Sequence, residues 1–193
     1  MKKLSGAALL LLLFVPALQA HPGHDGGTGF AHGFEHPLAG LDHLLAMIAV
    51  GLWAAQMGGR ALWIVPASFV GAMGIGGILG MNGVAIPFLE PGIAVSVLLL
   101  GLVIAFAVRP PVYVPALIVA AFALFHGVAH GAEMPANVSG VSFGLGFVLA
   151  TALLHLAGLG LGLGIGLQKS SPAPLVRALG VGVALLGGYL LIG

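Results

Sequence analysis

Charged side chains are scarce in this sequence. Only 6% of its 193 residues are Asp, Glu, Lys or Arg, whereas 60% are hydrophobic. A soluble domain carries about 25% charged residues, because its surface must be hydrated. Six basic and five acidic side chains form neither a basic face for nucleic acid nor an acidic tail. The composition therefore excludes a water-soluble domain and nucleic-acid partners, and it predicts a protein whose main solvent is the lipid bilayer.

Cysteine is absent. This absence excludes disulfides, thiolate-bound zinc and iron–sulfur clusters. The nucleotide-binding pattern GxxxxGK[ST] is also absent, so the energy for any transport must come from a gradient or from a partner. Metal chemistry in this chain must use histidine, carboxylate or methionine side chains, and the eight histidines stand out against so few charges.

The N-terminus has the pattern of a secretory signal peptide. Two lysines precede a short apolar run, Leu9–Val15, and Ala20 offers a small residue before a cleavage point. We interpret residues 1–20 as a cleaved signal peptide and residues 21–36 as a periplasmic N-terminal segment. An uncleaved signal anchor is the alternative interpretation.

Long apolar stretches recur after the N-terminal segment, each close to the about 20 residues that a membrane-spanning helix needs. We place six spans at residues 37–57, 61–80, 91–108, 112–132, 141–167 and 175–192. The predicted fold is therefore an all-α, polytopic membrane bundle of six transmembrane helices, forming one domain over residues 37–193.

Glycine spacing bears on how these helices pack. Between Gly158 and Gly166, glycine alternates with Leu and Ile, a period that by itself is typical of a strand. An open strand leaves its backbone groups unpaired in lipid, so we predict a helix with close packing at glycines four apart, as at Gly76 and Gly80 in the second span. These glycine faces could pack within or between protomers, which leaves a homo-oligomer as an alternative.

The basic residues predict the orientation of the bundle. After the signal peptide they are Arg60, Arg109, Lys169 and Arg177. All four fall on the same side of the six predicted spans, which the positive-inside rule makes cytoplasmic. Both ends of the mature chain are then periplasmic, and the protein is expected to be a multi-pass protein of a bacterial inner membrane.

Acids and histidines gather on the opposite side. The acids at or near the predicted outer face are Asp25, Glu35, Asp42, Glu90 and Glu133. The histidines that accompany them are His21, His24, His32, His36, His43, His126 and His130. This separation from the bases predicts that the outer half of the protein is a site for a cation.

Depth along the helices brings four of these residues into one layer. Asp42 and His43 lie about one and a half turns into the first predicted span, at a rise of about 1.5 Å per residue. His126 and His130 are four residues apart, so they share a helix face and can chelate one ion. His155 lies roughly 20 Å from the outer end of the fifth span and could be the next stop on a path.

Each of these candidate residues could instead have a purely structural role. Polar side chains within a bundle often hydrogen-bond between helices, although ionisable groups inside a span are functional by default. Glu90 and Glu133 rim the predicted mouth but could be solvated loop acids, and Met47 and Phe69 fit packing better than a ligand or a gate. Three further histidines are expected to lie on a flexible arm that collects metal only weakly: His21, His24 and His32.

The set of donor side chains indicates a metal-ion site, and three functions are compatible with such a site. Imidazoles and carboxylates without thiolate fit moderate affinity for Ni²⁺, Co²⁺ or Zn²⁺, and a transported ion must be both admitted and released. A permease is the first hypothesis. An intramembrane zinc hydrolase, with three histidines on zinc and a carboxylate base, is the second, and a metal-binding accessory or sensor protein is the third. Acids spread around a mouth and a deeper His155 favour a path over one closed site.

Two motifs resemble the HupE/UreJ family of nickel permeases. Residues 36–43 read HPxxGxDH and residues 125–133 read FHxxAHGxE, and the resemblance covers essentially the whole chain. It implies uptake of nickel, and sometimes cobalt, to supply hydrogenase or urease. We expect a non-enzymatic permease with no permanent cofactor that moves the ion from periplasm to cytoplasm. We prefer facilitated diffusion to proton coupling, because the membrane potential alone favours inward movement of a divalent cation. The path-lining residues that it implies are His36, Asp42, His43, His126, His130 and Glu133.

Overall fold

The computed structural model describes residues 29–165 and 174–193, and all its regular elements there are helices. They are α2 (Gly29–Ala39), α3 (Leu41–Met57), α4 (Ala61–Met81), α5 (Leu89–Ala105), α6 (Tyr113–Ala132), α7 (Gly140–Gly164) and α8 (Pro174–Ile192). The all-helical prediction is therefore confirmed over this part of the chain. The predicted signal peptide lies outside the described residues.

Several of these helices have the length and composition of membrane spans. Four are long and apolar enough to cross a bilayer, namely α4, α6, α7 and α8, and the bent pair α2 and α3 passes the same test as one unit. The remaining helix, α5, is apolar but has only 17 residues. The structure thus supports a membrane protein with four spans by this criterion, or five if the bent pair counts as one.

The first predicted span, residues 37–57, is not one continuous helix. The chain leaves helical geometry at Gly40, and α2 and α3 meet there at an angle of 82°. Pro37 lies inside α2 and has no backbone N–H to continue the helical hydrogen bonds. A Cβ on residue 40 would lie 2.8 Å from Oδ1 of Asp42, so glycine leaves room for that carboxylate. Asp42 and His43 consequently stand in the first turn of α3, rather than one and a half turns into a span.

The predicted N-terminal segment, residues 21–36, is not an extended arm where the structure describes it. From residue 29 onward it forms α2, which packs along α7. Gly33 lies against the backbone of Phe143, and Gly146 lies against the backbone of Phe30, so the two helices approach at glycines on both sides. This contact holds the end of α2 close to the start of α3.

Glycines also bring α4 and α6 together. A Cβ on Gly76 would lie 2.7 Å from the carbonyl oxygen of Leu124, and Gly80 faces the backbone of α6 one turn further on. On α6, Gly127 and Gly131 face the backbone of α4 in the same way. The predicted close packing of the second span is confirmed, and its partner is the helix that carries the FHxxAHGxE motif.

The glycine-rich stretch of α7 is helical, as predicted. Gly158 lies against the backbone of Ile48 on α3, and Gly51 of α3 lies against the backbone of α7 in return. By contrast, no atom of the protein lies within 4 Å of a Cβ built on Gly160 or Gly164. Only one side of the alternating glycine run therefore serves to pack α7 against α3.

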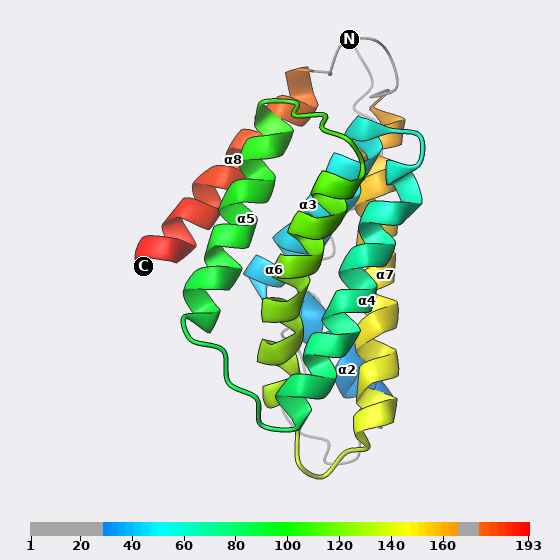
Figure 1. The fold of residues 1–193 in the computed structure, drawn as a ribbon, viewed down its shortest axis with the longest axis vertical. Helices are drawn as coiled ribbons and strands as arrows, with labels where there is room; N and C mark the ends of the chain where they lie inside the picture. The colour runs from blue at the N-terminus through cyan, green and yellow to red at the C-terminus, as the bar shows by residue number, and fades with distance from the viewer. Residues whose placement is uncertain (1–28, 166–173) are drawn as a thin grey trace, which may run out of the picture.

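The two ends of the bundle differ in charge. Figure 1 shows the α3–α4 and α5–α6 connections at one end, with the α4–α5 and α6–α7 connections and α2 at the other. Arg60 precedes α4 and Arg109 lies between α5 and α6, so both are at the first end. Glu90 lies in the first turn of α5 and Glu133 follows α6, so both acids are at the second end. The predicted segregation of bases from acids is therefore present in the fold.

Side-chain hydrogen bonds tie the helices together at the basic end. The Trp53 indole donates to the carbonyl of Val108 at 3.0 Å, and the Gln56 amide donates to the carbonyl of Ile104 at 3.1 Å. Arg177 donates from Nε to the carbonyl of Ala105 at 2.8 Å. These bonds hold α3 and α8 to the last turn of α5 and to the segment that follows it.

Candidate metal centre

Three buried histidines from two helices meet in one layer. His43 comes from the first turn of α3, and His126 and His130 come from successive turns of α6. Nε2 of His43 lies 2.7 Å from Nδ1 of His126, and it also contacts Nε2 of His130. The shared helix face expected from the i, i+4 spacing is thus observed, and both rings point at the same nitrogen of His43. We call these three residues the trihistidine layer.

The facing ring nitrogens of the trihistidine layer have more lone pairs than there are N–H protons to pair with them. A neutral imidazole has one N–H donor and one acceptor nitrogen. Nε2 of His43 can therefore form a normal hydrogen bond to only one of the two rings of α6 if it carries the proton. A cation bound among the three nitrogens could accept a lone pair from each of them, and imidazole is a common ligand of nickel, copper, zinc and iron.

Ser96 of α5 orients His126. The Ser96 hydroxyl donates to the carbonyl of Ile93 at 2.6 Å, and Nε2 of His126 lies 2.9 Å from the same oxygen. Because the one hydroxyl proton goes to Ile93, the oxygen accepts from His126, which places the ring proton on Nε2. Nδ1 of His126 is then the unprotonated nitrogen, and it faces His43. Such a hydrogen bond on the far side of a ligand imidazole is typical of metal sites.

Sequence reasoning missed Ser96. The available signal was a single hydroxyl in the otherwise apolar stretch from Ile93 to Ala105. A polar side chain in such a stretch requires a partner inside the bundle. Nothing in the sequence identified His126 as that partner, because the two residues lie on different helices.

A second group of donors lies toward the acidic end. Nε2 of His36 is 2.9 Å from Oε2 of Glu133, and Nδ1 of His130 is 3.4 Å from the same oxygen. Ligand atoms of these three residues all lie within 4.8 Å of one another. The hydrogen bond from His130, followed by that from His36, lowers the pKa of Glu133 to about 2 and so keeps it ionised. His130 belongs to both groups, with Nδ1 toward Glu133 and Nε2 toward His43.

These donors surround a small cavity at the acidic end, which we call the mouth. Its volume is about 180 Å³. Oδ1 of Asp42 accepts a hydrogen bond from the backbone N–H of His43 at 2.8 Å and lies 3.6 Å from Nδ1 of its ring. Glu90 is exposed at the rim. The residues that line the mouth are His36, Ala39, Gly40, Asp42, His43, Glu90, Ile93, Ala129, His130 and Glu133.

Phe69 and His155 continue this arrangement into the core. The buried ring of Phe69 has its centroid 5.8 Å from that of His126 and 5.1 Å from that of His155. His155 is therefore separated from the trihistidine layer by one aromatic ring, which agrees with its predicted greater depth. Met47 is fully buried in the apolar core, as the packing interpretation expects.

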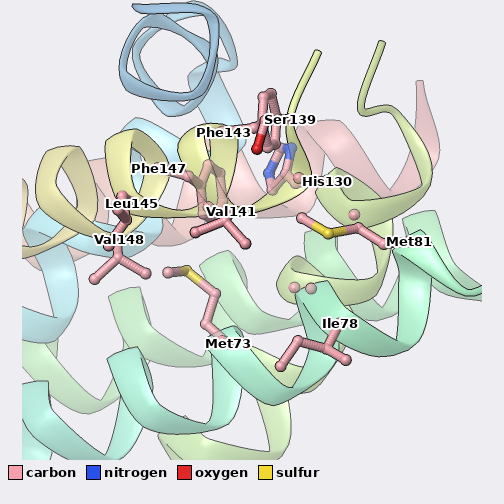
Figure 2. Close-up of a pocket in the computed structure, with 16 residues that line it drawn as sticks. Met73, Ile78, Met81, His130, Ser139, Val141, Phe143, Leu145, Phe147 and Val148 are labelled. Atoms are coloured by element: carbon pink, nitrogen blue, oxygen red, sulfur yellow. The ribbon is translucent and has the colours of Figure 1, made fainter. Parts of the chain in front are cut away.

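A larger cavity of about 530 Å³ lies beside the site, between α4 and α7, and it is almost entirely apolar. Figure 2 shows its labelled lining, in which Met73, Met81 and Phe147 accompany the two polar side chains, His130 and Ser139. Such a lining suits a hydrocarbon chain better than a hydrated cation. His130 is the one residue that reaches both this cavity and the mouth.

The structure also places the remaining candidates. His32 is exposed on the helix α2, so the prediction of a flexible arm is wrong for this residue, because α2 is held against α7. His21 and His24 lie outside the described residues. The six residues of the two motifs are brought together around the mouth and the trihistidine layer.

The sequence is similar to known proteins over nearly its whole length. Residues 9–190 match the model of the family described as HupE / UreJ protein. Over 186 residues the chain is 44% identical to "Protein HupE" of Rhizobium leguminosarum bv. viciae, covering 95% of each of the two chains. No solved structure shows a significant match.

Proposed function

The chain belongs to the HupE/UreJ family, and on that premise we propose that it is a permease for Ni²⁺. The observation that carries this proposal is the trihistidine layer, which lies directly beneath a mouth lined by Asp42, Glu90 and Glu133. Carboxylates at an opening attract and partly dehydrate a divalent cation, and imidazoles within replace its water ligands.

The kind of donor supports transport over permanent binding. Mixed imidazole and carboxylate ligands bind nickel, cobalt or zinc with moderate affinity, whereas the thiolates that hold a metal most firmly are absent. The assignment of nickel, with cobalt as a second substrate, rests on the family resemblance. So does the supply of hydrogenase or urease as the purpose of uptake.

His130 offers the cation a route from the mouth to the trihistidine layer. A cation held at the mouth by His36, Glu133 and Nδ1 of His130 needs to move only across the His130 ring to reach His43 and His126. One histidine that serves both groups lets the ion gain new ligands before it loses all of the old ones. Such overlapping sites permit both capture and release.

The proposed topology has six spans, with the bent pair of α2 and α3 counted as one span and the short α5 as another. The mouth then faces the periplasm, the end with Arg60 and Arg109 faces the cytoplasm, and both mature termini are periplasmic. Residues 1–20 would be removed as a signal peptide. A membrane potential of about 100 mV favours inward movement of two charges by about 4.6 kcal/mol, which is enough for facilitated diffusion in a bacterial inner membrane.

Uptake of radioactive nickel tests the proposal. Cells and proteoliposomes that contain the protein should accumulate nickel when the inside is negative, and Asp42→Asn or His130→Ala should abolish this uptake. His32→Ala is the matched control, because His32 is exposed on α2 and does not line the mouth. Uptake by His130→Ala at the rate of the unmodified protein would refute the site. Turnover of a substrate by purified zinc-bound protein, without nickel uptake, would instead favour an intramembrane hydrolase.

A further inference from the structure

His155 is a buried histidine whose ring has no hydrogen-bond partner. Only 1% of the residue is exposed, and neither ring nitrogen has a partner among the described residues. A neutral imidazole always has one N–H to donate and one lone pair to offer, and leaving both unpaired in an apolar interior is unfavourable. An apolar side chain at this position would avoid that penalty, so packing does not explain why a histidine is present.

The position of His155 in the fold suggests an explanation. The backbone of His155 lies against Gly51 of α3, and Gly158, less than one turn further along α7, lies against Ile48. Gly51 follows His43 by eight residues, which corresponds to about 12 Å along α3. His155 therefore lies roughly that distance from the trihistidine layer, toward the basic end of the bundle.

The Phe69 ring contacts both His155 and the His126 ring of the trihistidine layer. Phe69 makes an edge contact with the His155 ring, at an interplanar angle of 85°, and its other neighbour is His126. Its helix, α4, contains Pro66 less than one turn earlier, which removes a backbone hydrogen bond close to Phe69. Rotation of this ring would connect the two histidines.

A hydroxyl and a thioether, both potential weak ligands, lie about one turn of α7 from His155. Thr151, one turn earlier on α7, directs its hydroxyl to the thioether sulfur of Met73 at 3.6 Å, and both residues are buried. A cation that arrived here would find an imidazole with a free lone pair, a hydroxyl and a sulfur. None of these groups carries a charge, so the affinity would be low and release would be easy.

We propose that His155 is an inner binding station for the transported divalent cation, reached from His126 when the Phe69 ring moves aside. This inference rests on the proposed permease function, and it assigns to the chain a further site that the two motifs do not include. The ligand class is a partly dehydrated divalent transition-metal ion, since imidazole nitrogen is the principal donor.

Initial rates of nickel uptake, measured in proteoliposomes over a range of nickel concentrations, test the inner station. His155→Leu should lower the maximal rate about tenfold or more, while the concentration for half-maximal uptake stays close to that of the unmodified protein. The thermal unfolding temperature should not fall, because the substitution removes an unpaired polar group. Leu156→Ala is the control: it alters the residue next to His155 on the exposed side of the same helix and should retain uptake.

A second variant covers the case in which His155→Leu fails to fold. The chain has no cysteine, so His155→Cys introduces a single thiol. Titration of this purified variant with Co²⁺ should produce the near-ultraviolet absorption of cobalt bound to thiolate. Leu156→Cys places the thiol on the exposed side of α7 and should not produce it. Absence of the absorption in folded His155→Cys would overturn the inner station.

The outcomes separate the two proposals. Absence of nickel uptake by the unmodified protein would refute the permease, and the inner station with it. Normal maximal uptake by a folded His155→Leu variant, alongside uptake by the unmodified protein, would refute the inner station alone.

Discussion

Because α6 packs closely against α4, we expect Gly127→Ala to disturb both the fold and the metal site. Gly127 follows the metal-site residue His126 and faces the backbone of α4. An added Cβ would clash first with the carbonyl oxygen of Met73, and it would lie 2.8 Å from the amide nitrogen of Gly77 and 2.9 Å from the Cα of Gly76. Backbone atoms cannot turn aside as a flexible side chain can, so the two helices would have to separate.

The size of that separation can be worked out. Ordinary van der Waals contact of a Cβ begins at 3.4 Å, and the carbonyl oxygen of Met73 is its closest neighbour, so α6 must move by roughly 1 Å. Functional sites tolerate displacements of about 0.5 Å. The strain should destabilise the protein by about 1–3 kcal/mol, offset by up to about 1 kcal/mol because alanine favours the helix. We therefore expect Gly127→Ala to fold with a lower unfolding temperature and to lose most of its nickel uptake.

Gly71→Ala provides the control for Gly127→Ala. Gly71 lies in α4, the helix that packs against α6, but no atom of the described residues lies within 4 Å of a Cβ built there. The same substitution at this position should leave nickel uptake unchanged and stabilise the helix slightly. Both variants are to be compared by nickel uptake in proteoliposomes and by thermal unfolding in detergent. If Gly127→Ala matched Gly71→Ala in both measurements, close packing of α6 would not be what positions the histidines.

Other predictions concern the mouth and its supports. Glu133 stays ionised at any pH well above 2, since its pKa is lowered to about 2. Glu133→Gln should therefore reduce nickel uptake by proteoliposomes by the same factor at about pH 5 and about pH 8, and a loss confined to one of these pH values would contradict this reasoning. Ser96→Ala should weaken nickel binding to the purified protein about tenfold by releasing His126, and unchanged affinity would argue against that role. Gly40→Ala should displace the Asp42 carboxylate and reduce nickel uptake. The double variant Gly40→Ala/Asp42→Asn should then lose little more uptake than Asp42→Asn alone. If the two losses were additive, Gly40 would act independently of Asp42.

Local patterns in the sequence predicted the parts of the site that lie on one helix. The spacing of His126 and His130 placed both rings on one face of α6, and the scarcity of charge on an apolar chain predicted the helices. The depth of His43 from the outer end brought it into the same layer, although the helix that carries it begins later than predicted. Each of these inferences depended only on the period of the helix and the thickness of the bilayer.

Contacts between helices could not be predicted in this way. The bend at Gly40 depends on the space that the Asp42 carboxylate needs, which is visible only once the turn is built. The bond between Ser96 and His126 joins helices that are 30 residues apart in sequence. The place of Phe69 between two histidines likewise follows from the packing of α4, α6 and α7, and periodicity alone had favoured a packing role.

The FHxxAHGxE stretch places metal ligands on one face of α6 and packing glycines on another. His126 and His130 repeat every four residues and point to α3, while Gly127 and Gly131 repeat with the same interval and face α4. Successive residues of a helix differ by about 100° in direction, so a histidine followed by a glycine directs a ligand to one neighbour and admits the backbone of another. The glycines hold α6 against α4, and this close approach determines where the imidazoles lie relative to His43. A variant that keeps the histidines but fills the glycine positions should therefore retain every metal donor and still lose the site.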